Sequence, residues 1–481
     1  MPRQMSLSVA VLVASLNVSL PQTRSADWPM WGGSADRNMV SSERNIPSEW
    51  DVGEGRNIKW VAKLGSYTYG SPVVADGKVY IGTNNSGELR PGIKGDKGVL
   101  VCLEEQTGKF LWQATHDKMA SGAVNDWPEQ GICSGPLVDG DRLYYVSNRC
   151  ELICADARGF LDGENDGPFT KEKYRDKQDA DFIWVLDMYE ELKVFPHNLA
   201  TSSPVGFEDI VFVNTSNGVD EGHGKPPHPD APDFLAVDKR TGKVLWQGGE
   251  PGANVLHGQW SSPACGVIGG QPQAIFAGGD GWCYSYEPKI GKLLWKFDLN
   301  PKDSKWEGRG RGVRNSIIAT PVIFDDKVFL ATGQDPEHGD GPGSLCCIDA
   351  TKRGDITETG QVWRVGGDDF HRTLSTVAIA DDLLYASDLT GYLYCLDAKT
   401  GKRHWRFDTF ASVWGSPGLI DGKVYLGTED GEVVVLQHSA TMKKLAVNDV
   451  QNAMYTAPVA ANGVLFIASR RSLYAIGAGE E

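Results

Sequence analysis

Eight short segments of the sequence carry side chains that are suited to binding an organic molecule. They combine imidazole, guanidinium and amide groups with tyrosine and tryptophan rings, and they recur at intervals between Gly65 and Thr456. Aromatic rings make apolar walls, and amide and cationic donors fix polar atoms of a ligand. If the segments meet in one funnel, we expect a site for a polar or anionic organic molecule. The candidates are Tyr67, Asn125, Trp127, His197, Asn198, His257, Trp260, Arg314, Asn315, His371, Arg372, Trp414 and Tyr455.

These segments have a second interpretation, in which they are only links between neighbouring structural units. A link exposes backbone groups, and polar side chains are needed to cap them. The sequence leaves both interpretations open.

Metal binding by histidine is not favoured by the sequence. His223, His228 and His338 lie in Gly- and Pro-rich loops with acidic residues nearby, but no spacing defines a coordination set. No catalytic motif such as a Gly-rich phosphate loop or a nucleophile elbow is present either.

An acidic stretch, "GFLDGENDGPFTKEKY", resembles the first half of a calcium loop. Asp162, Glu164 and Asp166 alternate and are followed by Gly167. The twelfth place, where a bidentate glutamate belongs, is Lys173, which excludes an intact EF-hand. A looser calcium site at the three acids and a solvated acidic loop both remain open.

The elements that must position these residues are repeated. "LDAKTGKRHW" has near-copies in "LEEQTGKFLW", "VDKRTGKVLW" and "YEPKIGKLLW". A second motif, such as "GSPVVADGKVYIGT", precedes each of these and occurs eight times. Each motif reads as a β-hairpin, so one unit is a four-stranded antiparallel sheet. Such sheets must stack to bury both faces, which predicts an all-β, eight-bladed β-propeller.

Tryptophans are expected to fill the wedges between blades. The last unit, ending at "SLYAIGAGEE", lacks its outer strand, whereas "NIKWVAKLG" is an orphan strand before the first unit. We therefore predict that the N-terminal strand completes the C-terminal blade and closes the ring. The docking residues are Trp60, Trp112, Trp184, Trp246, Trp295, Trp363 and Trp405.

Three insertions follow the second strand of alternate units, at 84–98, 216–232 and 333–344. The strand order of a propeller places them on the face that carries the eight candidate segments. The acidic stretch follows a third strand, so it is expected on the opposite face.

The chain has nine cysteines, an odd number, so at least one of them cannot be paired within the chain. Four of them occupy one repeat position that elsewhere accepts Ala or Ser, which indicates a small buried slot. Cys346 and Cys347 are adjacent, but both lie in an expected strand, where neighbouring side chains point to opposite faces. A disulfide between them would be strained.

The net charge of the chain indicates which partners it can bind, and its N-terminal residues indicate where in the cell it is located. With 47 basic and 63 acidic side chains, the chain is a poor match for nucleic acid. Residues 1–26 have the pattern of a cleaved signal peptide, with a retained membrane anchor as the alternative. No cysteine precedes Cys102, so no lipid anchor is expected, and no later stretch is apolar enough to cross a membrane. We expect residues 27–481 to form one exported propeller domain, periplasmic or extracellular.

The repeats "DAKTGKRHW" and "DKRTGKVLW" resemble the tryptophan-docking repeat of the pyrroloquinoline quinone (PQQ) β-propeller superfamily. The resemblance covers roughly residues 27 to 478, and "DWPMWGGSADRNMVSSE" is similar to the lead-in of exported bacterial members. It implies one of two functions. One is a non-catalytic propeller like BamB that binds an envelope protein or a small polar ligand. The other is a quinoprotein dehydrogenase that oxidises alcohols or sugars with PQQ and calcium. The sequence favours the binding propeller, because no catalytic set is identifiable.

Overall fold

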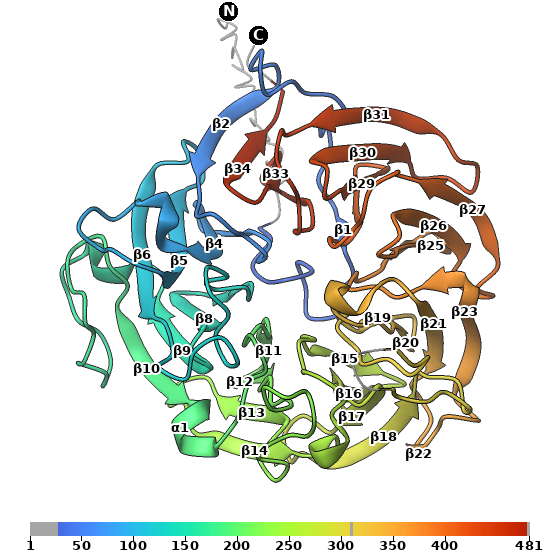
Figure 1. Cartoon of the computed structure of the whole chain (residues 1–481). Helices are drawn as coiled ribbons and strands as arrows, with labels where there is room; N and C mark the ends of the chain where they lie inside the picture. The colour runs from blue at the N-terminus through green and yellow to red at the C-terminus, as the bar shows by residue number, and fades with distance from the viewer. Residues whose placement is uncertain (1–26, 308–310, 479–481) are drawn as a thin grey trace, which may run out of the picture.

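The computed structural model describes residues 27–307 and 311–478, and these form a closed ring of eight β-sheets (Figure 1). Each sheet is built from four antiparallel strands, and two of the sheets gain a short fifth strand. The predicted eight-bladed β-propeller is therefore confirmed. The expected leader, residues 1–26, lies outside the described residues. Within them, no helix is both long and apolar enough to cross a membrane.

The strands follow the repeat. Blade one contains β3 (Val73–Ala75), β4 (Lys78–Asn84), β5 (Lys97–Glu104) and β6 (Phe110–Asp117), and blade two contains β7 (Leu137–Asp139), β8 (Arg142–Val146), β9 (Glu151–Asp156) and β10 (Phe182–Asp187). Blade three contains β11 (Val205–Phe207), β12 (Ile210–Asn214), β13 (Phe234–Asp238) and β14 (Val244–Gly248). Blade four contains β15 (Ala264–Ile268), β16 (Gln271–Ala277), β17 (Trp282–Tyr286) and β18 (Leu293–Asp298), with β22 (Gly354–Asp355) added outside.

Blade five contains β19 (Val322–Phe324), β20 (Lys327–Ala331), β21 (Pro342–Asp349) and β23 (Gln361–His371), and blade six contains β24 (Ala378–Ala380), β25 (Leu383–Ser387), β26 (Tyr392–Asp397) and β27 (Arg403–Asp408). Blade seven contains β28 (Gly418–Ile420), β29 (Lys423–Gly427), β30 (Glu432–Gln437) and β31 (Lys444–Asp449), with β1 (Val40–Ser41) added inside. Blade eight contains β32 (Val459–Ala461), β33 (Val464–Ala468), β34 (Ser472–Ile476) and β2 (Ile58–Lys63). The short helices are η1 (Asn85–Gly87), η2 (Gly159–Leu161), α1 (Met188–Leu192), η3 (Gly252–Asn254) and η4 (Pro336–His338).

The ring closes as predicted. β2 is the outer strand of the last blade and pairs antiparallel with β34, so that Trp60 lies opposite Ala475 (Figure 1). The two ends of the chain thus share one sheet, and β2 covers the edge of β34 that would otherwise be unpaired.

Tryptophans occupy the seams between blades. In five seams the indole Nε1 donates a hydrogen bond to a backbone carbonyl oxygen of the next blade, at 2.8–3.0 Å. The indoles that do so are Trp60, Trp184, Trp246, Trp363 and Trp405. Trp112 and Trp295 are fully buried at the equivalent positions. The docking role predicted for all seven is consistent with this packing.

Hydroxyl groups link the blades nearer the axis. Each repeat begins with a small residue, in most cases before proline. In five repeats the side chain of this residue accepts a hydrogen bond from the equivalent backbone N–H of the preceding blade. The donor–acceptor pairs are Gly135–Ser203, Ser203–Ser262, Thr320–Thr376, Thr376–Ser416 and Ala457–Ser71, at 2.9–3.2 Å. The "SP" and "TP" pairs of the sequence are therefore contacts between blades.

The N-terminal segment, residues 28–41, was expected only as a lead-in, but it runs around the inside of the ring (Figure 1). Backbone N–H groups on the innermost side of six blades donate to it: those of Val74, Val138, Cys265, Ile323, Ile379 and Leu419. Arg37 reaches a seventh blade, where its guanidinium donates to the carbonyl oxygens of Ser203 and Pro204, and Ser41 reaches the eighth through Ala460. The segment satisfies inner edges that would otherwise stay unpaired.

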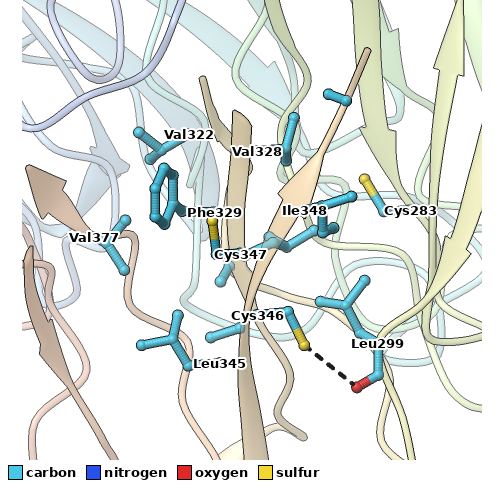
Figure 2. Packing of buried hydrophobic residues seen from close by; sticks show 14 of the residues in the cluster. Cys283, Leu299, Val322, Val328, Phe329, Leu345, Cys346, Cys347, Ile348 and Val377 are labelled. Atoms are coloured by element: carbon cyan, nitrogen blue, oxygen red, sulfur yellow. Dashed lines mark hydrogen bonds between the residues drawn. The ribbon is translucent and has the colours of Figure 1, made fainter. Parts of the chain in front are cut away.

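Seven of the nine cysteines lie in strands, and Cys133 and Cys150 lie in loops. All nine are unpaired thiols. Cys346 and Cys347 lie within β21 and point in opposite directions, Cys346 toward Leu299 and Cys347 beside Phe329 (Figure 2). The strand geometry predicted for this pair is confirmed.

Candidate functional site

A cavity of about 330 Å³ lies on the axis of the ring. Every blade contributes to its lining, and the N-terminal segment supplies Trp31, whose Nε1 donates to Thr320 Oγ1 at 3.1 Å. Five of the predicted funnel residues line it: Trp127, Asn198, Trp260, Trp414 and Tyr455. The hydroxyls of Ser71, Ser203, Ser262, Thr320, Thr376 and Ser416 form a band around it.

One wall of the cavity is aromatic. Tyr69 stacks on Tyr455 with ring centroids 4.9 Å apart, and Trp414 lies 4.8 Å from Tyr455. Tyr67 stacks behind Tyr69 and carries the Arg470 guanidinium 3.7 Å from its ring centroid. Tyr67 therefore supports the wall from behind. Tyr69, two residues further on, lines the cavity itself and was not among the residues predicted from the sequence.

The opposite wall is held by contacts between links. Trp260 Nε1 donates to the His197 carbonyl oxygen at 3.1 Å, and Trp127 N donates to the Asn198 carbonyl oxygen at 2.8 Å. Trp127 is also 42 % exposed, so its ring is accessible at this face. Asn125 is buried and donates to the Pro196 carbonyl oxygen, which ties two links together without reaching the cavity.

The charge in the cavity is negative. Asp335 and Glu337, from the third insertion, belong to its lining, and the described part of the lining contains no Lys or Arg. This differs from the cationic funnel that the sequence suggested.

The predicted arginines are bound to the protein itself. Arg314 donates to Asp298 at 3.0 Å and to the Asp280 carbonyl oxygen at 3.0 Å. Arg372 is buried and donates to Asn315 Oδ1 at 2.7 Å, and His371 Nδ1 lies 3.2 Å from Asp388 Oδ2. For these four candidates the contacts match the linking interpretation.

The three insertions do meet the candidate segments. Asp96 in the first accepts from the Glu129 backbone N–H at 2.7 Å. The ring of His223, from the second, lies 4.8 Å from that of His197, and the ring of His338, from the third, lies 4.7 Å from that of His257.

These contacts bring four histidines together. His197, His223 and His257 each offer a potential ligand atom, and these atoms all lie within 4.8 Å of one another. A second group, which shares His257, adds Asp335 and His338. The sequence did not favour histidine ligation at His223 and His338, because residues this far apart in the chain have no recognisable spacing. The geometry places both in the cluster, and His228 outside it.

The surroundings lower the pKa of one histidine of the cluster and the pKa of the neighbouring carboxyl group. Burial, and then the neighbouring His257, lower the pKa of His197 to about 4, so its imidazole is neutral at pH 7. Burial alone would raise the pKa of Asp335, but contacts with His257 and His338 outweigh it and hold that pKa below its usual range. A neutral imidazole keeps a free lone pair on one of its ring nitrogens.

The loop that contains the acidic stretch continues along the outer edge of β6. Asp179 bridges to Gln113 in β6, and Arg90 of the first insertion pairs with Asp176 and Asp179. The position of the three acids on the opposite face stays a prediction.

The three acids proposed for calcium are engaged separately. Asp162 pairs with Arg158 at 3.2 Å and accepts from the Glu164 backbone N–H, while the Asp166 N–H donates to Asp181. They are not among the groups of converging ligand atoms found in the described residues. Calcium binding there stays a prediction.

The axial site fits PQQ and calcium poorly. PQQ carries several carboxylates, which need cationic partners. Among the described residues of the cavity lining, the charged ones are Asp335 and Glu337, which are acidic. Calcium takes an all-oxygen ligand set, whereas the donors beside the cavity are mainly imidazole nitrogens.

Comparison with known proteins places the chain among proteins with the same repeat. The sequence profile described as outer membrane protein assembly factor BamB matches residues 57–161, 92–354 and 352–445. BamB of Moranella endobia is 21% identical over 402 residues, which is 74% of this chain and 87% of that protein.

Two similar proteins are named as dehydrogenases. The 1-butanol dehydrogenase (cytochrome c) of Thauera butanivorans is 25% identical over 163 residues, 29% of this chain, and the match spans only 19% of that enzyme. A europium-containing methanol dehydrogenase has the same fold, with a TM-score of 0.62 at 12% identity over 94% of this chain and 98% of that chain.

Proposed function

Because the chain belongs to the family described as outer membrane protein assembly factor BamB, we propose that it is an exported, non-catalytic propeller that binds a small polar molecule in its axial cavity. The name of the family points to the cell envelope, and the signal-peptide pattern of residues 1–26 agrees with export.

The observation that carries this proposal is the lining of the cavity. The Tyr69, Trp414 and Tyr455 wall offers π faces, and the hydroxyl band offers donors and acceptors. Aromatic walls with a few placed polar groups are characteristic of small-molecule sites. Among the described residues of the lining, the charged ones are Asp335 and Glu337, and both are acidic. A neutral or cationic molecule is therefore favoured over an anion.

The test is a ligand panel applied to purified protein. Neutral sugars and polyols, small amines and quaternary ammonium ions, and PQQ with Ca²⁺ are titrated while tryptophan fluorescence and Tm are recorded. A neutral or cationic binder is expected to raise Tm, because a ligand of the native state stabilises it.

Trp414→Ala is expected to weaken that binding at least about tenfold, a loss of about 1.4 kcal/mol. Trp282→Ala is the matched control, since Trp282 is a partly exposed tryptophan outside the cavity, and it should leave affinity unchanged.

Tighter binding of PQQ with Ca²⁺, together with dye reduction on adding alcohols, would overturn the proposal in favour of a quinoprotein dehydrogenase. A panel with no binder, combined with capture of an envelope protein that is lost on altering Trp127, would replace the small ligand by a protein partner.

A further inference from the structure

The cluster of histidines beside the cavity is not accounted for by the proposed function. We propose that His197, His223 and His257 bind one divalent transition-metal ion of the zinc type. Their potential ligand atoms all lie within 4.8 Å of one another. Nitrogen ligands of one tetrahedral zinc ion are about 3.4 Å apart, so a small inward shift of the side chains would complete the site. The three residues come from two links between blades and from the second insertion, so the fold alone brings them together.

His197 has the arrangement of a metal ligand. Its Nδ1 lies 2.9 Å from the Val219 carbonyl oxygen, which can only accept, so Nδ1 carries the proton. Nε2 then presents a lone pair, and this buried atom has no hydrogen-bond partner. A second partner that fixes the tautomer in this way is the usual support of a metal-binding histidine.

His257 is oriented in a similar way. Its Nδ1 lies 2.8 Å from Asp335 Oδ2, within ion-pair distance, and both of its ring nitrogens are buried without a hydrogen bond. The residue is 2 % exposed, and its backbone carbonyl oxygen accepts from Val219 N at 2.9 Å. Val219 thus holds both His197 and His257, and Asp335 acts as the carboxylate behind a ligand.

A purely structural role explains these residues less well. Leaving a buried polar nitrogen without a hydrogen bond costs about 1–3 kcal/mol, and both His197 and His257 have such an atom. Aliphatic side chains of similar size would fill the same space without that cost. An ion coordinated at the two Nε2 atoms would remove it.

The choice of metal follows from the donors. Imidazole nitrogen suits Zn²⁺, Co²⁺, Ni²⁺ and Cu²⁺, whereas Ca²⁺ requires oxygen. Three histidines leave a fourth position for water or for a ligand atom. Trp260 and Asp335 belong both to the wall of the cavity and to the surroundings of His257, so the ion would lie beside the cavity. The proposal does not depend on which organic molecule the cavity accepts.

The experiment uses the full exported chain, stripped with chelator and titrated with Zn²⁺ and Co²⁺ by calorimetry and absorption spectroscopy. One ion per chain is expected, with visible Co²⁺ bands typical of nitrogen ligands and a rise in Tm on adding Zn²⁺. Ca²⁺ is expected to give neither heat nor stabilisation at this site.

His223→Ala is the main variant, because His223 is exposed and its loss leaves the core intact. It should weaken Zn²⁺ binding at least about 100-fold, and Asp335→Asn should weaken it about 10–100-fold. His228→Ala, an exposed histidine in the same insertion, is the control and should bind like the unaltered chain.

Equal Zn²⁺ affinity in His223→Ala and His228→Ala would overturn the proposal, as would the absence of any stoichiometric Zn²⁺ or Co²⁺ binding. Stoichiometric Zn²⁺ binding in the absence of any organic ligand would support the metal site, even if no molecule of the ligand panel bound to the cavity.

Discussion

The indole of Trp60 lies on the backbone of Gly108, so closely that a methyl group at Gly108 would come within 2.5 Å of the ring. Trp60 Nε1 also donates to the Glu105 carbonyl oxygen at 2.9 Å. The strand that completes the last blade is thereby docked on the first blade.

Gly108→Ala is expected to destabilise the ring more than Gly77→Ala. Both glycines have positive φ, +69° and +72°, but nothing lies within 4 Å of the Cβ position at Gly77. Gly77→Ala should cost about 1 kcal/mol for backbone conformation. Gly108→Ala should cost about 1–3 kcal/mol more, because it displaces the indole. Urea denaturation measures both, and equal losses would show that the seam tolerates movement of Trp60.

Arg37→Met is expected to lower the free energy of unfolding by at least about 3 kcal/mol. The buried guanidinium donates to the carbonyl oxygens of Pro263, Ser203 and Pro204 at 2.8–2.9 Å. Methionine fills similar space but leaves these acceptors without donors. Arg240→Met, at a largely exposed arginine, is the control and should change stability by less than about 1 kcal/mol. Similar melting curves for the two variants would contradict the central role of Arg37.

Asp280→Asn is expected to change the pH dependence of stability. Burial raises the pKa of Asp280 from 3.8 to about 6, although the Tyr284 hydroxyl and the Trp282 N–H donate to it. The folded state therefore binds this proton more tightly than the unfolded state, and ionisation costs about 3 kcal/mol between pH 4 and 6.

Asparagine stays neutral and can still accept from Trp282 and donate to the Tyr284 hydroxyl. Relative to the unaltered chain, the variant should gain about 3 kcal/mol as the pH rises from 4 to 7. Denaturation at both pH values measures this gain. A difference that does not change with pH would mean that Asp280 is ionised in the folded protein throughout.

The thiols are expected to react slowly in the native protein. Cys133 lines the cavity, and burial raises its pKa to about 12. Since the thiolate is the reactive form, alkylation at pH 8 should be about 1000-fold slower than for an ordinary cysteine. Unfolding without reductant should release all nine thiols. A lower count would reveal a disulfide.

The sequence was most informative where the repeat applied. Trp60 could be assigned to the last blade for two reasons. Its strand lies before the first repeat and belongs to none, and the eighth repeat, at the C-terminal end, lacks an outer strand. The small residue near proline was visible as a motif, although its contact with the next blade was not, because that contact joins residues in different repeats.

Residues outside the repeat were much harder to predict. Trp31 and Arg37 lie in a segment without periodicity, and only the closed ring shows that they fill its centre. His223 and His338 are far apart in the chain, so their meeting depends on how two loops fold over one face. Arg314 and Arg372 were expected to face a ligand, but nearby acceptors such as Asp298 and Asn315 bind them first.

The inner path of residues 28–41 gives one short stretch of chain contacts with all eight blades. The segment is therefore an internal tie between blades that are distant in sequence, in addition to the tryptophan seams and the closing strand.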